Sequence, residues 1–225
     1  MPSSTCLGAQ QSSLTISALM LSFLSIPWVD KCIAVLASLP ASLEAYRFYR
    51  HGLMDLPRAL FFAQAALFVV TMLIRRNPVR ISANPWCWLV AFVSSNYALL
   101  TAASLRAGVR VAPAAFINAL AVFGLWMSIF ARFSLGRNIA LVPAQREIVT
   151  GGMYRYIRHP IYSAYFVSAT GWVLSSWSLV NALVIASGCA IFVVRTLMEE
   201  SFLSQDPCYL AYMKRVRGRW LPWLV

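Results

Sequence analysis

Long apolar stretches separated by short polar breaks dominate the chain. Several stretches approach the ~20 residues that a helix needs to cross a bilayer, and the breaks contain helix-ending proline, glycine and asparagine. The pattern predicts an all-α fold, a polytopic transmembrane helix bundle of about six spanning helices (five to seven). We expect these helices at 28–47, 59–74, 87–104, 111–133, 160–176 and 179–200. Residues 1–27 form an N-terminal extension to which the pattern assigns no definite structure, and 28–225 a single integral membrane domain.

The last two predicted helices form a hairpin with an interfacial tail behind it. Their lengths are similar, about 25 Å and 31 Å at ~1.5 Å per residue, and the serine-rich turn between them is very short. The two helices must therefore be antiparallel neighbours, with the start of one beside the end of the other. This geometry brings His159 and Tyr162 toward Glu199 and Glu200.

Composition and charge support a membrane protein. The chain is 60% hydrophobic and 12% charged, and its net charge is +12. Because the basic residues lie mostly between apolar runs, they indicate membrane orientation and lipid contacts, and we expect no nucleic-acid partner. Most of them fall on the side that holds the C-terminus and both polar clusters, which predicts a cytoplasmic face in a cell inner membrane. The scattered cysteines show no metal-binding spacing, so no metal is expected.

The polar segment 151–162 ends in His159-Pro160, at the start of a predicted helix. Proline is favourable at the first helical position, and the free N–H groups of a helix start favour an anion. Arg155 and Arg158 add positive charge, so a small carboxylate could bind there. The alternative is a basic loop that faces lipid headgroups and leads into a proline-started helix.

Glu199 and Glu200 are the adjacent acid pair of the chain, near a predicted helix end. The helix dipole disfavours negative charge there by roughly 0.3–1 kcal/mol for each acid. One explanation is an ion pair between Arg195 and Glu199, which lie one helical turn apart, with Glu200 exposed to water. This pair would account for only one of the two acids. A ligand with cationic centres would relieve the cost of both. S-adenosylmethionine combines a carboxylate with an ammonium and a sulfonium, and Tyr154 and Tyr162 offer aromatic faces to such a cation.

At these residues the sequence resembles the isoprenylcysteine carboxyl methyltransferase and phospholipid methyltransferase superfamily of integral membrane enzymes. The motifs that carry the resemblance occur in the family's order over roughly residues 130–225. They are Leu135-Gly136-Arg137-Asn138, Gly152-x-Tyr154, Arg158-His159-Pro160-Ile161-Tyr162, Arg195-x-x-x-Glu199-Glu200 with Leu203, Tyr209-x-x-Tyr212, and a basic segment ending at Pro222.

The resemblance implies an S-adenosylmethionine-dependent methyltransferase with its cofactor-binding core at 132–225. It implies that Tyr154, His159, Tyr162, Glu199 and Glu200 bind the cofactor. It further implies that Arg195 and Asn138 are catalytic or lie on the substrate side. The methyl acceptor is then a lipophilic or small membrane-accessible carboxylate, thiol or amine. Two alternatives stay open, a non-catalytic membrane module of the same fold and an NADPH-binding membrane reductase of the sterol reductase type.

Overall fold

The computed structural model describes residues 56–76, 78, 80–82, 84–102, 107–140 and 142–222, with a few residues between 43 and 52. The predicted extension 1–27 and most of the predicted helix 28–47 lie outside these residues. The described part is mostly helical, as predicted. Its α-helices are α3 (Leu56–Ile74), α4 (Pro85–Ala102), α5 (Ala114–Leu135), α6 (Pro160–Ser175), α7 (Leu179–Leu203) and α8 (Pro207–Arg215).

The predicted helices from residue 59 onward recur with small shifts at their ends, but the number of membrane spans is not confirmed. In the described part of the chain, the helical segments that are long and apolar enough to cross a bilayer are Ala114–Asn138 and Leu179–Leu203. Helix α6 is shorter, at 16 residues. It begins at Pro160, as the sequence predicts, because proline needs no N–H partner at the first helical position.

Several short elements connect α3, α4, α5 and α6 at one end of the molecule. Strands β1 (Arg80–Ile81) and β2 (Ala144–Gln145) pair antiparallel, with Arg80 opposite Gln145. The 3-10 helices η1 (Gly136–Asn138) and η2 (Gly152–Arg155) lie before and after β2. The sequence pattern did not predict these elements.

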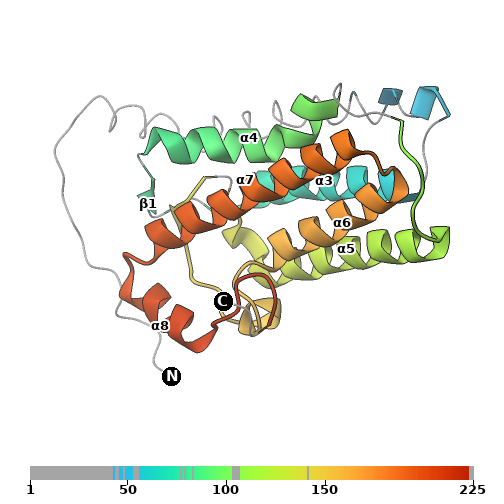
Figure 1. The fold of residues 1–225 in the computed structure, drawn as a ribbon. Helices are drawn as coiled ribbons and strands as arrows, with labels where there is room; N and C mark the ends of the chain where they lie inside the picture. The colour runs from blue at the N-terminus through green and yellow to red at the C-terminus, as the bar shows by residue number, and fades with distance from the viewer. Residues whose placement is uncertain are drawn as a thin grey trace.

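The long helices run side by side (Figure 1). Helix α5 packs against α3 and α6, and α7 packs against α6 and α4. Helices α6 and α7 are antiparallel, which confirms the predicted hairpin. The C-terminal ends of α5 and α7 and the N-terminal ends of α4 and α6 consequently lie at the same end of the molecule as α8. At the opposite end, Val109 and Trp177 exchange two backbone hydrogen bonds of 2.9 and 2.8 Å. These bonds connect the segment before α5 to the turn of the hairpin.

Helices α5 and α6 approach each other closely at Gly124. A Cβ atom at this position would come within 2.3 Å of the Ser168 hydroxyl and 3.3 Å of the Ala164 carbonyl oxygen. Glycine therefore allows the two backbones to approach at a distance that a larger residue would prevent.

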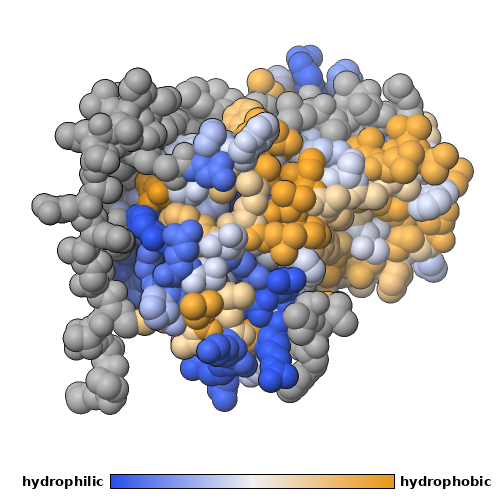
Figure 2. Space-filling model, turned by 60° about the vertical axis from the view of Figure 1, so that its left-hand side comes forward, coloured by the Kyte–Doolittle hydropathy of each residue, from blue (hydrophilic) through white to orange (hydrophobic). Residues whose placement is uncertain are grey.

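The described surface separates into an apolar part and a polar part (Figure 2). Hydrophobic residues cover the helical body, and hydrophilic residues gather toward the end that carries α8. Large aromatic side chains of α5 are exposed, among them Phe123, Trp126, Phe130 and Phe133. A lipid environment suits such a surface better than water does.

Candidate cofactor site

The start of α6 is covered by the chain segment that follows α8. The backbone N–H groups of Arg158 and His159 donate to the carbonyl oxygens of Gly218 and Arg219, both at 2.9 Å. The Ser163 hydroxyl, one turn into α6, donates to the Trp220 carbonyl. The helix start predicted to hold an anion is thus partly occupied by the protein's own backbone.

Glu200 lies at the centre of a buried ion cluster. Its Oε1 atom accepts from Arg158 Nε at 2.6 Å and lies 3.0 Å from His159 Nε2. Its Oε2 atom accepts from Arg219 Nε at 2.9 Å and from Arg158 Nη2 at 3.3 Å. The side chains of Arg158 and Glu200 are 4% and 5% exposed. The two polar clusters of the sequence therefore meet through direct ion pairs.

Glu199 is less completely satisfied than its neighbour. Its Oε2 atom accepts a 2.8 Å hydrogen bond from the Tyr162 hydroxyl, and no described residue donates to Oε1. The Tyr162 ring stacks on His159 at a centroid distance of 5.5 Å. Glu199 is only half-buried, so one carboxylate oxygen is available to a ligand.

Arg195 lies over the Tyr162 ring, with its guanidinium carbon 5.6 Å from the ring centroid. It is buried and donates to the hydroxyls of Ser94 at 2.9 Å and Ser95 at 3.1 Å, both on α4. The structure therefore does not show the ion pair between Arg195 and Glu199 that the sequence allowed. Arg195 connects α7 to α4 beside the proposed cofactor contacts.

Asn138 and Arg146 lie on the segment between α5 and α6. The Oδ1 atom of Asn138 and the Nη1 atom of Arg146 are buried and have no partner among the described residues. Arg146 Nε donates to the Arg76 carbonyl at 2.9 Å. Burial lowers the pKa of Arg146 to about 10, and the negative charge of Glu199 acts in the opposite direction. The sequence pattern did not indicate Arg146 as a site residue. A single arginine in a loop of a membrane protein cannot be told from the other basic residues that set membrane orientation.

Tyr154 lies in η2 and is buried. Its carbonyl oxygen accepts a 2.7 Å bond from the Tyr212 hydroxyl of α8. Burial raises the pKa of the Tyr154 phenol well above its usual value, and the charge of Glu199 raises it further. The phenol therefore stays protonated at neutral pH and can donate a hydrogen bond.

The structure thus brings His159, Tyr162, Glu199 and Glu200 into direct contact and places Arg195 against Tyr162. Tyr154 and Asn138 come from the adjoining segment. Arg219 lies in the basic segment that ends at Pro222, but the motifs assigned it no role, because only the fold brings it to Glu200. The binding and catalytic roles assigned to these residues remain predictions.

Apolar helices around a buried polar cluster at one end define a membrane-associated protein with a candidate ligand site. Residues 114–206 match the family model of the phospholipid methyltransferases. This segment is thus similar to the integral membrane methyltransferases, and the family implies methyltransferase activity and lipid-related substrates. It runs from α5 to Asp206, so it includes the predicted site residues but ends before Arg219. No curated protein matched the chain.

Proposed function

We propose that the chain transfers a methyl group from S-adenosylmethionine to a lipophilic or small membrane-accessible acceptor, a carboxylate, a thiol or an amine. The cofactor would bind where α6 begins and α7 ends, against the segment 138–154. The observation that carries this proposal is a set of polar side-chain atoms that lack a partner among the described residues.

Three such atoms are relevant here, and two of them lie on residues that interact electrostatically, Glu199 and Arg146. Glu199 Oε1 and Asn138 Oδ1 can accept hydrogen bonds, and Arg146 Nη1 can donate one. S-adenosylmethionine offers the complementary groups, because its ammonium and ribose hydroxyls donate and its carboxylate accepts. A buried polar atom without a partner costs roughly 1–3 kcal/mol, so a ligand that satisfies these atoms gains affinity. The residues present therefore fit the cofactor.

The two glutamates then have different roles. We place Glu199 and Tyr162 in contact with the cofactor. Glu200 already accepts from Arg158, His159 and Arg219, so its role is to fix the start of α6 and the C-terminal segment. His159 contributes the face of its ring, which stacks on Tyr162 and keeps that phenol directed at Glu199.

The reaction requires mainly positioning and the exclusion of water. When bound, the cofactor supplies a methyl group on a cationic sulfur. Arg195 lies one helical turn before Glu199 on the same face of α7, so it can orient an acceptor that approaches from the bundle interior. The Tyr162 ring holds the Arg195 guanidinium in place by cation–π attraction. The segment 216–220 and α8 cover the site on the polar end.

Calorimetric titration of the purified protein with S-adenosylmethionine and with NADPH tests this function. The wild type should bind the methyl donor and not NADPH. Glu199→Gln should weaken binding about tenfold or more, which corresponds to ~1.4 kcal/mol. Glu147→Gln is the matched control, because Glu147 is an exposed acid paired with Arg76. Binding of NADPH alone, or equal affinity in the Glu199→Gln variant, would contradict the proposal.

A further inference from the structure

A second cationic group lies inside the bundle, away from the ion cluster. Arg132, in the last turn of α5, is 3% exposed. Its Nη1 atom donates to the Thr71 hydroxyl of α3 at 3.1 Å, and Nη2 donates to the Tyr165 hydroxyl of α6 at 2.8 Å. Its Nε atom is 3.4 Å from the Ser128 hydroxyl. The guanidinium therefore lies where α3, α5 and α6 meet.

All of these partners are neutral. Four of the chain's seven acidic residues are described, and each is engaged elsewhere. Glu147 pairs with Arg76, Glu199 with Tyr162, Glu200 with Arg158, and Asp206 with Gln145 and the N–H of Cys208. A buried charge without a counter-charge costs several kcal/mol, so the bundle contains a cation that an anion would stabilise.

Arg132 also keeps donor capacity for such an anion. A guanidinium has five N–H groups, and the described hydrogen bonds use three. Gln64 lies on the same face of α3 as Thr71, about two turns earlier. Its Nε2 atom donates to Ser168 at 2.9 Å, and its buried Oε1 atom has no described partner. The interior at this point is thus polar and incompletely satisfied.

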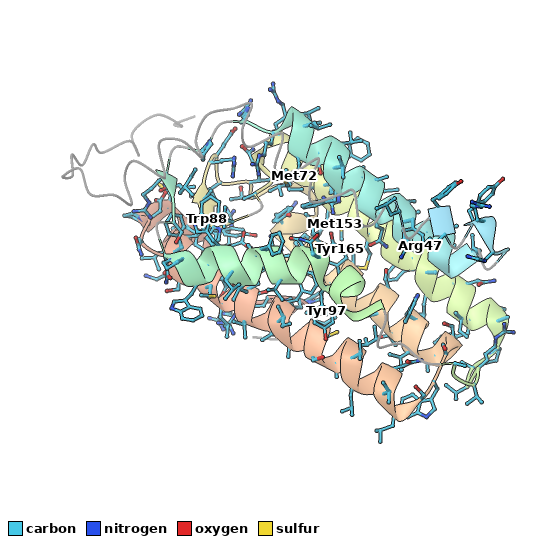
Figure 3. All side chains as sticks on the ribbon, turned by 90° about the horizontal axis from the view of Figure 1, so that it is seen from above. Arg47, Met72, Trp88, Tyr97, Met153 and Tyr165 are labelled. Carbon is cyan, nitrogen blue, oxygen red and sulfur yellow. The ribbon has the colours of Figure 1, made fainter. Side chains whose placement is uncertain are left out.

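A row of aromatic rings connects Arg132 to the proposed cofactor contacts. The Tyr165 ring lies 5.2 Å from Phe192, and Phe192 lies 5.6 Å from Tyr162, whose hydroxyl binds Glu199. Arg132 also acts electrostatically on the Tyr154 phenol. Seen from above, Tyr165 and Met153 lie between the ribbons of α3 and α4 (Figure 3). An acceptor held at Arg132 would therefore have its reactive end near the cofactor site.

We propose that Arg132, with Tyr165, binds an oxyanion of the methyl acceptor, a carboxylate or a phosphate. The planar guanidinium suits both, because it can form two parallel hydrogen bonds to either group. The acyl or alkyl part of the acceptor would lie among the apolar helices. This inference rests on the proposed function and adds the chemical class of the group that the enzyme recognises.

Binding of model amphiphiles to the full chain in non-ionic detergent tests this site. The probes are dodecanoate, dodecyl phosphate and the neutral dodecanol, measured by thermophoresis. The wild type should bind at least one anionic probe about tenfold more tightly than dodecanol, as expected for charge-assisted hydrogen bonds. A preference for dodecyl phosphate points to a phosphate-containing lipid, and a preference for dodecanoate to a free carboxylate.

Arg132→Gln should remove the preference for the anion and leave the affinity for S-adenosylmethionine unchanged. Arg215→Gln removes an exposed cation from α8 and should retain the preference. If Arg132→Gln does not fold, Arg132→Lys carries the test, and the preference should fall roughly threefold or more because lysine lacks the planar fork.

Equal binding of all probes by the wild type, or an unchanged preference in the Arg132 variant that folds, would overturn the inference. If the wild type prefers the anion but does not bind S-adenosylmethionine, the proposed function is refuted and the anion site at Arg132 stands.

Discussion

At the scale of single residues, two adjacent acids have different environments. Glu200 is surrounded by Arg158, His159 and Arg219, whereas Glu199 has one described hydrogen-bond donor, Tyr162. Successive residues of a helix point about 100° apart, so neighbours in sequence can serve separate purposes. One acid stabilises the fold around the site, and the other can meet a ligand.

This difference predicts that two conservative substitutions affect stability to different extents. Glu200→Gln should lower the free energy of unfolding by ~3 kcal/mol, because it leaves buried cations without a counter-charge. Glu199→Gln should change it by less than ~1 kcal/mol, since that acid is half-buried and loses only part of one hydrogen bond. Thermal unfolding of both variants without cofactor measures the effects. Equal destabilisation by the two variants would contradict the division of roles.

The sequence motifs identified the residues that the structure brings together around Glu199 and Glu200. Arg132, Arg146 and Arg219 were interpreted only as orientation signals or tail charges. Each acquires its partners from segments distant in the chain, as when Arg219 returns to Glu200. A local pattern contains no information about such partners. Of these three arginines, only Arg132 lies within a predicted membrane span, where a cation requires a partner. Its importance could therefore have been inferred from the sequence.

At the scale of helices and strands, the apolar pattern predicted the body of the bundle. Predicted and observed starts differ by at most three residues in α3, α4, α5, α6 and α7. The short elements η1, η2, β1 and β2 were missed because tertiary contacts determine them. Tertiary contacts also determine the path of segment 216–220, which folds back against the start of α6. There Arg158 Nη1 donates to the carbonyls of Val216 at 2.7 Å and Arg217 at 2.8 Å.

The contact between α5 and α6 leads to a second prediction. Gly124→Ala should destabilise the protein by ~1–3 kcal/mol, because the new methyl group would meet the Ser168 hydroxyl. Ser168→Ala removes that hydroxyl, so the double variant should lose less stability than the sum of the single variants. Unfolding of all four proteins in mixed detergent gives the coupling energy. Strict additivity would show that the helices do not meet at this point.

At the scale of the whole molecule, charge and hydropathy divide the chain into two ends. The end with α8 carries the ion cluster, and the opposite end carries the hairpin turn at 176–178. An excess of arginine and lysine favours the cytoplasmic side of a membrane. We therefore predict that the candidate site and the C-terminus lie in the cytoplasm.

Reporter fusions test this orientation. A fluorescent protein fused after the last residue should fluoresce, and alkaline phosphatase fused there should be inactive. Alkaline phosphatase joined within 176–178 should be active, because that turn would lie on the other side of the membrane. The reverse pattern would place the candidate site outside the cytoplasm and contradict the predicted orientation.

Photochemical cross-linking of tritiated S-adenosylmethionine to the wild-type protein tests the central claim most directly, because it locates the bound cofactor. The label should appear in peptides that contain 138–162 and 192–203, and excess unlabelled S-adenosylhomocysteine should suppress it. Label confined to α4 or α8, or no label that the competitor suppresses, would show that the meeting point of α6 and α7 is not the cofactor site.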